Sequence, residues 1–171
     1  MSSSEALVRR RRLLRAAPAL AAAMVLPGCG FELRRAAELH FDSIALTGFA
    51  PRSPLEQELR LALERSVKVT EDQAKAQVVF QALVDQRTRR AVTYTASGQV
   101  RDIQLRMQLR YRAQTPSERE LIPASNIEKI REMTFIEAKA LGKQQEEQDV
   151  YREMQSDIVL QVMLRLSAIR L

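Results

Sequence analysis

Apolar and polar residues alternate without interruption between residues 103 and 112. A period of two predicts a β-strand with one face in a core and the other face wet or in contact with a partner. The apolar positions are Ile103, Leu105, Met107, Leu109 and Tyr111. The polar positions are Gln104, Arg106, Gln108, Arg110 and Arg112. We expect the first set to form the inner layer of a sheet.

Strand-forming residues also precede this segment. Residues 78–85 and 91–95 are rich in β-branched and aromatic side chains, which fit a pleated surface. The turn sequence Ala-Ser-Gly-Gln that follows places Gly98 where a positive φ is tolerated. Together these segments predict a long hairpin with residues 103–112.

Two further strands are predicted outside the hairpin. Residues 41–49 carry apolar side chains on both sides, which indicates a covered strand that ends at Gly48 and the turn at Ala50 and Pro51. A poorer alternation places another strand within residues 125–136.

Two helices complete the predicted domain. Ser53, Pro54 and Glu56 form a capping box with proline at the first helical position, and the apolar positions that follow predict an amphipathic helix over 54–65. Residues 146–171 contain no glycine or proline and predict a second helix. Its apolar side chains recur at helical spacing: Tyr151, Met154, Ile158, Val162, Leu166 and Ile169. The predicted fold class is α+β, a two-layer sandwich with two helices packed on a mostly antiparallel four-stranded sheet.

The first 28 residues have the organisation of an export signal. A run of arginines precedes an alanine-rich apolar segment, 16–26, which is too short for a membrane span of roughly 20 residues. The sequence Leu-Pro-Gly-Cys at its end resembles the lipobox of bacterial lipoproteins. We therefore predict that residues 1–28 are removed and that Cys29, the only cysteine, is acylated. The alternatives are an incidental free cysteine or a buried one, and the arginine run also weakly resembles a twin-arginine signal.

Removal of the signal changes the charge of the protein. The full chain has a net charge of +6, whereas residues 29–171 hold 22 basic and 20 acidic residues, a net charge of +2. A nucleic-acid binder therefore loses its main support, and no aromatic residues are interleaved with the arginines to stack on bases. The remaining 143 residues suit one domain with one core.

The sequence offers no catalytic or metal-binding constellation. His40 is the only histidine, and a lone histidine is usually a surface or core residue. No phosphate loop, nucleophile motif or metal-ligand cluster is present in the sequence. Glu146 and Glu147 lie at the start of the predicted helix, where the helix dipole stabilises carboxylates. We expect a protein that is not an enzyme and needs no cofactor or metal.

Three segments together carry a resemblance to a known family: 28–34, Gly-Cys-Gly-Phe-Glu-Leu-Arg; the Ser-Gly-Gln turn at 97–99; and Glu147-Gln148-Asp149, which leads into the predicted C-terminal helix. In this order they resemble the opening, the hairpin turn and the last helix of the LPS-assembly lipoproteins called LptE. The resemblance covers nearly all of residues 29–171. It implies a non-enzymatic lipoprotein that complexes with the β-barrel LptD, acts as its plug and assembly chaperone, and helps to deliver lipopolysaccharide to the outer leaflet.

The same resemblance gives the expected location and partners. Gly30, rather than an aspartate, follows Cys29, which by the lipoprotein sorting rule favours the periplasmic face of the outer membrane. The expected partners are an LptD-like barrel, lipopolysaccharide and the membrane through the lipid anchor, with no nucleic acid. The alternative is a lipoprotein adaptor of another envelope complex, such as a lipid ABC-transport system.

Basic residues are the candidates for contact with the phosphates of lipid A, because guanidinium groups bind phosphate bidentately. Arg87, Arg89 and Arg90 lie in the first strand of the predicted hairpin. In the family a lysine before the C-terminal helix and an arginine at the hairpin turn are linked to lipopolysaccharide; Lys143 matches the first, but Ala96 or Ser97 replaces the second. The hypothesised lipopolysaccharide-binding residues are Lys143, Arg101, Arg106, Arg110 and Arg112. The alternative is a solvated strand face, or one that meets the inner wall of a barrel.

Overall fold

A computed structural model of the chain describes residues 38–135 and 140–171. The predicted signal peptide and Cys29 lie outside the described residues. The described elements, in chain order, are β1 (Ser43–Thr47), α2 (Pro54–Glu64), β2 (Lys68–Thr70), a 3-10 turn (Gln73–Lys75), β3 (Val78–Tyr94), β4 (Val100–Gln114), β5 (Glu120–Thr134) and α3 (Ala140–Leu166). No helix among these residues is long and apolar enough to cross a membrane.

The sheet is mixed and has five strands, in the order β2-β1-β3-β4-β5. β1 pairs in parallel with both β2 and β3, whereas β3, β4 and β5 form an antiparallel meander. The prediction of four mostly antiparallel strands was therefore wrong in number and in type. β2 was missed because a strand of three residues is too short to show an alternation. Its parallel pairing follows from α2, which connects β1 to β2 as a crossover.

The helix α2 begins as its sequence predicts. The hydroxyl of Ser53 accepts a hydrogen bond from the backbone N–H of Glu56 at 3.2 Å, and Pro54 occupies the first turn. Leu55, Leu59 and Leu63 are buried against the sheet. The capping box thus fixes the start of the helix, which ends at Glu64, one residue earlier than predicted.

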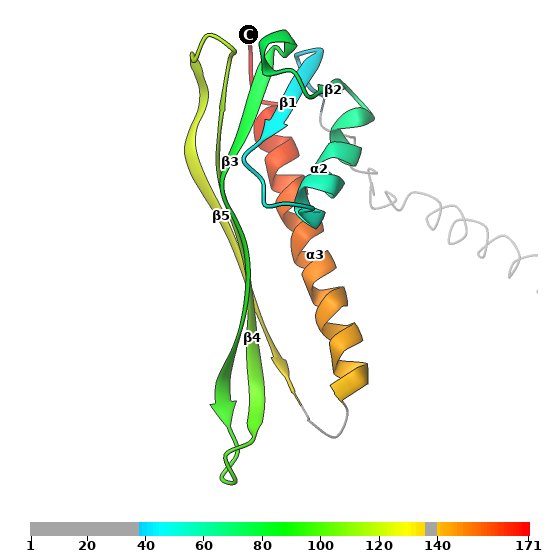
Figure 1. Cartoon of the computed structure of the whole chain (residues 1–171), viewed down its shortest axis with the longest axis vertical. Helices are drawn as coiled ribbons and strands as arrows, with labels where there is room; N and C mark the ends of the chain where they lie inside the picture. Colours follow the sequence, from blue (N-terminus) through cyan, green and yellow to red (C-terminus); the bar gives the residue numbers. More distant parts are fainter. Residues whose placement is uncertain (1–37, 136–139) are drawn as a thin grey trace, which may run out of the picture. The chain divides into compact units, whose positions relative to one another are not determined.

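The helix α3 is 27 residues long and begins at Ala140, six residues before the predicted start. Residues 142–149 contain no large apolar side chain, so the periodicity of the sequence contains no signal for this first part. Figure 1 shows α2 and α3 on the same side of the sheet. This confirms the predicted two-layer arrangement. Among the described residues, no helix covers the opposite side of the sheet.

The core lies between this sheet face and the two helices. All five apolar positions of the alternating segment are at most 1% exposed, which confirms the predicted face. They pack with residues from every layer, and the largest fully buried partners are Phe80, Ile44, Leu55, Leu59, Leu63, Met154 and Ile158. The ring of Tyr111 stacks on Phe80 with centroids 4.8 Å apart. Residues 38–171 therefore contain a complete core and form one compact unit.

The two turns of the meander have the same construction. In each, a threonine hydroxyl accepts a hydrogen bond from the backbone N–H four residues later, at 3.1 Å for Thr95 with Gln99 and for Thr115 with Arg119. The fourth residue of each turn has a positive φ, 80° at Gly98 and 62° at Glu118. The second turn was not predicted because glutamate rarely adopts this conformation.

Candidate functional site

The uncovered face of the sheet is a lattice of polar side chains. Neighbouring strands are joined across it by hydrogen bonds of side chains, from Arg112 to Gln81 at 2.8 Å, from Gln108 to Asn126 at 3.0 Å and from Gln104 to Glu132 at 3.1 Å, and by an ion pair between Arg106 and Glu128. Arg90 also donates two hydrogen bonds to Gln104, at 2.8 and 3.1 Å. These cross-strand pairs stiffen the face and satisfy most of its charges.

The structure places the five hypothesised lipopolysaccharide-binding residues on two sides of the sheet. Arg106, Arg110 and Arg112 lie in a row on the uncovered face, because all three occupy even-numbered positions of β4. Arg101 lies on the helix side by the same alternation, and its side chain is 66% exposed. Lys143 lies in the first turns of α3 and pairs with Glu146 at 2.6 Å. The structure therefore brings three of these residues together and separates them from the other two.

Two arginines of β3 face α3 instead of the open side. A β-bulge at Leu83 shifts the register of β3 against β4, so that the odd-numbered positions after it face the helix. Arg87 bonds to the buried Gln155, and Arg89 pairs with Glu147 at 3.1 Å. Arg90, the next residue, faces the uncovered side. Arg87 and Arg89 thus join the hairpin to α3.

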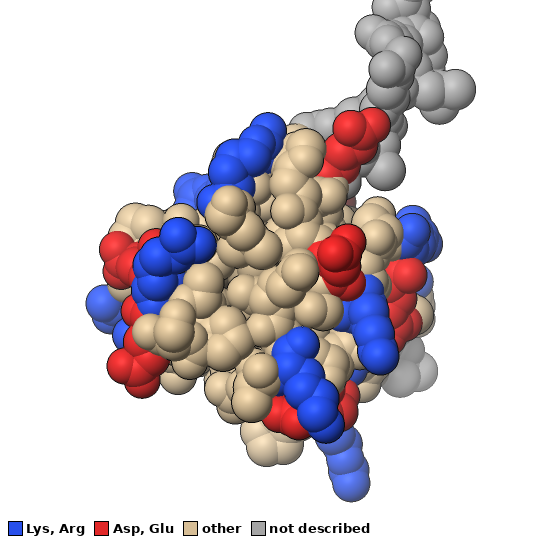
Figure 2. Space-filling model, turned by 90° about the horizontal axis from the view of Figure 1, so that it is seen from above, with Lys and Arg blue, Asp and Glu red and all other residues tan. Residues whose placement is uncertain are grey.

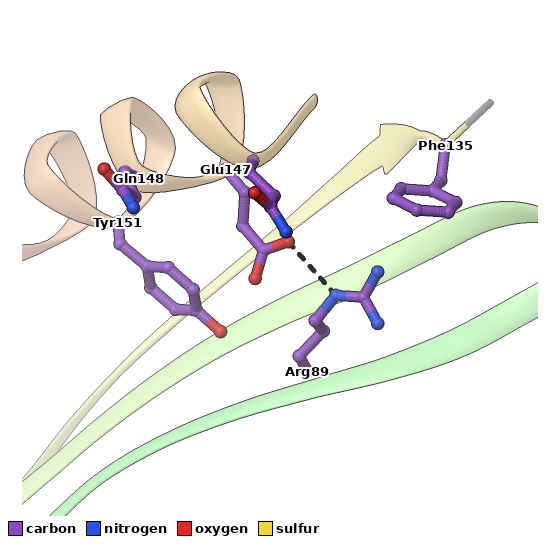
Figure 3. Close-up of a pocket in the computed structure, with 6 residues that line it drawn as sticks. Arg89, Phe135, Glu147, Gln148 and Tyr151 are labelled. Carbon is purple, nitrogen blue, oxygen red and sulfur yellow. Dashed lines mark hydrogen bonds and ion pairs between the residues drawn. The ribbon is translucent and has the colours of Figure 1, made fainter. Parts of the chain in front are cut away.

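A cleft of about 720 Å³ lies between the hairpin and the first part of α3. Its walls combine an arginine, a carboxylate, two amides and two aromatic rings: Arg89, Glu147, Gln144, Gln148, Phe135 and Tyr151. Figure 3 shows the guanidinium of Arg89 between Glu147, to which it is joined, and the ring of Phe135. The guanidinium carbon lies 5.0 Å from the centroid of that ring, within the range of a cation–π contact.

The charges around the cleft affect the pKa of Tyr151. Burial, and next the nearby charge of Glu147, raise the pKa of Tyr151 above its usual value, while Arg87 and Arg89 lower it. The guanidinium of Arg87 lies 5.4 Å from the centre of the tyrosine ring, and the hydroxyl donates to the backbone oxygen of Thr88 at 2.9 Å. The tyrosine therefore stays neutral and acts as a polar-edged wall of the cleft.

The described residues contain no group of histidine, cysteine, aspartate and glutamate side chains that could hold a metal ion. His40 is exposed at the start of the domain, outside the cleft residues. At the end of the domain viewed in Figure 2, basic and acidic side chains alternate around an uncharged centre, so no patch of one sign forms there.

Sequence reasoning missed the cleft. Tyr151 was assigned to the core stripe of the last helix, and Phe135 fell at the end of a weakly predicted strand. The six residues that line the cleft come from β3, the end of β5 and α3. No local pattern connects them, because only the bulge in β3 and the early start of α3 bring them together.

The comparisons with known proteins agree on one family. The model of the family described as "LptE: Lipopolysaccharide-assembly" matches residues 41–166. A solution structure of the uncharacterised lipoprotein B from Nitrosomonas europaea is similar over 81% of this chain and 91% of that one, with 27% identity and a TM-score of 0.68. The rare lipoprotein B from Shewanella oneidensis, at 20% identity and a TM-score of 0.57, shares the fold over 71% of this chain and 93% of its own.

No curated protein sequence matches the chain. The family match nevertheless spans the first strand, the meander and the whole of the last helix. The chain belongs to the LptE family of lipopolysaccharide-assembly proteins.

Proposed function

We propose that the mature protein is a lipoprotein anchored through Cys29 to the periplasmic face of the outer membrane, where it forms a complex with an LptD-like barrel. In this complex it acts as a plug and assembly chaperone and aids the delivery of lipopolysaccharide to the outer leaflet. It does this by binding, without catalysis. The family match supports the general role.

The observation that carries the specific role is the uncovered polar face of the sheet. Strands of 15 to 17 residues present a surface of arginine, glutamine, asparagine and glutamate with no helix over it among the described elements. The interior wall of an outer-membrane barrel is polar in the same way. Because most charges on this face already have partners, it can lie against such a wall with few unpaired charges to desolvate.

The basic residues then divide by the face on which they lie. Arg106, Arg110 and Arg112 meet the barrel wall, and Arg110 has no hydrogen bond or ion pair to another described residue, which leaves its guanidinium for the partner. Lys143 and Arg101, on the helix side, meet the phosphates of lipid A. Contacts of this charge-assisted kind contribute about 1.5–3 kcal/mol each and weaken with salt.

Co-purification from outer membranes tests this function. A tagged chain should bring down an LptD-like barrel as its dominant partner. Charge reversal of the row, Arg106→Glu with Arg110→Glu and Arg112→Glu, should reduce the yield of barrel. Reversal of Lys143 and Arg101 should leave the complex intact and lower lipopolysaccharide binding. Recovery of an ABC-transport complex instead of a barrel would replace this function with that of an adaptor.

Mass spectrometry of the same material tests the anchor. We expect Cys29 to be the first residue and to carry acyl chains, and Cys29→Ser should abolish both processing and acylation. A mature chain that still contains residues 1–28 would contradict the proposed lipid anchor.

A further inference from the structure

The strand β5 forms one edge of the sheet, and no strand among the described residues pairs with its outer side. Its pairing with β4 is regular from Ser125 to Thr134, a stretch that contains no bulge and no proline. Natural proteins usually interrupt or cover an edge of this length, because its unpaired backbone groups can pair with another chain. This stretch, which we call the β5 edge, is therefore a candidate interaction surface.

The hydrogen bonds of β5 show which of its backbone groups point outward. The N–H of Phe135 donates to the backbone oxygen of Arg101 in β4 at 2.7 Å. In an antiparallel pair, residues that bond to the neighbouring strand alternate with residues that point away from it. The odd-numbered residues of the β5 edge therefore bond to β4. The even-numbered residues direct N–H and C=O outward, and all five are exposed: Asn126, Glu128, Ile130, Glu132 and Thr134.

The outer edge of β3 is protected in ways that the β5 edge is not. The pairs of β3 with β1 end at Gln81, and beyond them no described strand covers its outer side. A bulge follows at Leu83, and the register shifts again near Thr93. The backbone oxygen of Thr88 also accepts a hydrogen bond from Tyr151 at 2.9 Å, which ties the strand to α3. Bulges of this kind turn an edge away from other chains, and the β5 edge has none.

The charged side chains of the β5 edge bond inward. Glu128 pairs with Arg106 of β4, and Lys129 pairs with Asp157 of α3 at 2.9 Å. These partners draw the side chains toward neighbouring elements, so the outward backbone groups stay accessible. The charges also differ between the two faces of the strand. Acidic residues lie on the uncovered face and basic residues on the helix side: Glu128 and Glu132, and Lys129 and Arg131.

This charge pattern disfavours pairing with a second copy of the β5 edge. Side chains that are directly opposite in an antiparallel pair lie on the same face, so even-numbered residues would meet even-numbered residues. No such register places a base opposite Glu128 or an acid opposite Lys129, whereas several place like charges together. Like charges directly opposite one another are destabilising. The pattern is therefore complementary to a different chain.

We propose that the β5 edge binds an extended segment of another protein, which joins the sheet as a strand beside β5. Basic side chains of the segment lie opposite Glu128 and Glu132. Acidic side chains lie opposite Lys129 and Arg131, and an apolar side chain lies opposite Ile130, which is 45% exposed.

Strand addition of this kind takes its affinity from main-chain hydrogen bonds and its specificity from alternate side chains. The outward groups of the β5 edge repeat about every 6.8 Å, the spacing of alternate residues in any antiparallel partner. The inference goes beyond the proposed function, because it adds a partner strand at the edge of the sheet, whereas the barrel wall meets the uncovered face.

A capped synthetic peptide, Thr-Lys-Glu-Val-Glu-Lys-Thr, tests the edge by NMR on the mature chain, residues 29–171 with Cys29→Ser. Its sequence reads the same in both directions, so it can pair in parallel or antiparallel. In the free chain the amides at 126, 128, 130 and 132 should exchange with solvent faster than those at 127, 129 and 131, which bond to β4. Saturating peptide should shift the signals of the first set and slow their exchange at least about tenfold. Absence of a saturable shift in β5 would overturn the proposal.

A second peptide separates strand addition from general charge attraction. Thr-Glu-Lys-Val-Lys-Glu-Thr has the same composition and net charge but exchanges the two signs. It should bind at least about fivefold more weakly, because four cross-strand pairs become repulsive. Equal binding of the two peptides would contradict the proposed charge pattern.

Two variants test whether the backbone of the edge takes part. Ile130→Pro removes one outward N–H and no bond to β4, and proline is tolerated in an edge strand in this way. It should abolish binding of the first peptide. Ile130→Thr keeps the N–H, and as the matched control it should retain the affinity within about threefold. Equal binding by both variants would overturn the proposal. Thermal melts by circular dichroism show whether each variant is folded; should Ile130→Pro unfold, the comparison of the two peptides on the unmutated edge decides alone.

Discussion

Replacement of Gly48 by alanine should destabilise the domain more than the same replacement at Gly98. Both glycines have nearly the same positive φ, 76° and 80°. They differ in the space around a new Cβ atom. At Gly48 it would collide with the backbone oxygen of Ala82 in β3 and lie 3.2 Å from the carbonyl carbon, whereas at Gly98 nothing lies within 4 Å. The pair therefore separates backbone strain from a steric clash.

The expected magnitudes follow from these two terms. A left-handed alanine costs about 1–2 kcal/mol, and the loss of glycine freedom in the unfolded chain returns about 0.4–1 kcal/mol. Gly98→Ala should therefore lower the free energy of unfolding by about 0–1.5 kcal/mol. Gly48→Ala adds a clash with backbone, and overpacking of this kind costs about 1–3 kcal/mol more.

Urea denaturation followed by far-ultraviolet circular dichroism measures both variants in the mature chain with Cys29→Ser. The midpoint should fall for Gly48→Ala well below that for Gly98→Ala, at an unchanged slope. Equal losses at the two positions would mean that the approach of β1 to β3 at Ala82 is not close, and that the parallel pairing there is looser than described.

Further predictions concern the core, the second turn and a buried tyrosine. Leu105→Ala and Leu109→Ala should each cost about 2–5 kcal/mol in denaturation experiments, and near-zero losses would mean that the faces of β4 are reversed. Gln155→Leu should cost about 1–3 kcal/mol, because the carbonyl and the carboxylate that it bonds to in α2 lose their donor; a neutral effect would show that water replaces it. Glu118→Gly should stabilise the protein by up to about 1 kcal/mol by relieving a positive φ, and a loss of stability would count against strain there. Burial raises the pKa of Tyr111 above 10.0, so the folded state keeps this proton longer than the unfolded state and stability should fall as the pH rises above about 10; NMR titration of its ring should give the higher pKa, and a normal value would contradict it.

The parts of the fold that local patterns determine were predictable from the sequence. The alternation of residues 103–112 gave the buried face of β4, and the capping box at Ser53 gave the start of α2. The parallel pairs and β2 were not predictable in the same way. They depend on a three-residue strand that is held by its neighbour β1 and by the crossover through α2, and a segment of that length has no periodicity of its own.

The candidate site was harder to predict, because it depends on register. A single extra residue at Leu83 turns Arg87 and Arg89 toward α3 and leaves Arg90 on the open face. A bulge of this kind moves every side chain beyond it to the opposite face of the sheet. The position of the bulge cannot be predicted from the amino-acid composition of the strand. The predicted arginine row survives on β4, where no bulge interrupts residues 103–110. The contact of this row with lipopolysaccharide that the sequence predicted stays a prediction, whereas the proposed function assigns the row to the barrel wall.

The two matching turns of the meander also have a kinetic consequence. β3, β4 and β5 are consecutive in the chain and are closed by five-residue connections whose threonine hydroxyls hold the turn together, so their pairing involves short loops. The pairing of β1 with β3 must instead close a loop of more than thirty residues. Because loop closure slows with sequence separation, we expect the meander to form first and to serve as the template on which β1, α2 and α3 dock. Mutations in the two turns should then slow folding, whereas mutations in β1 should mainly speed unfolding.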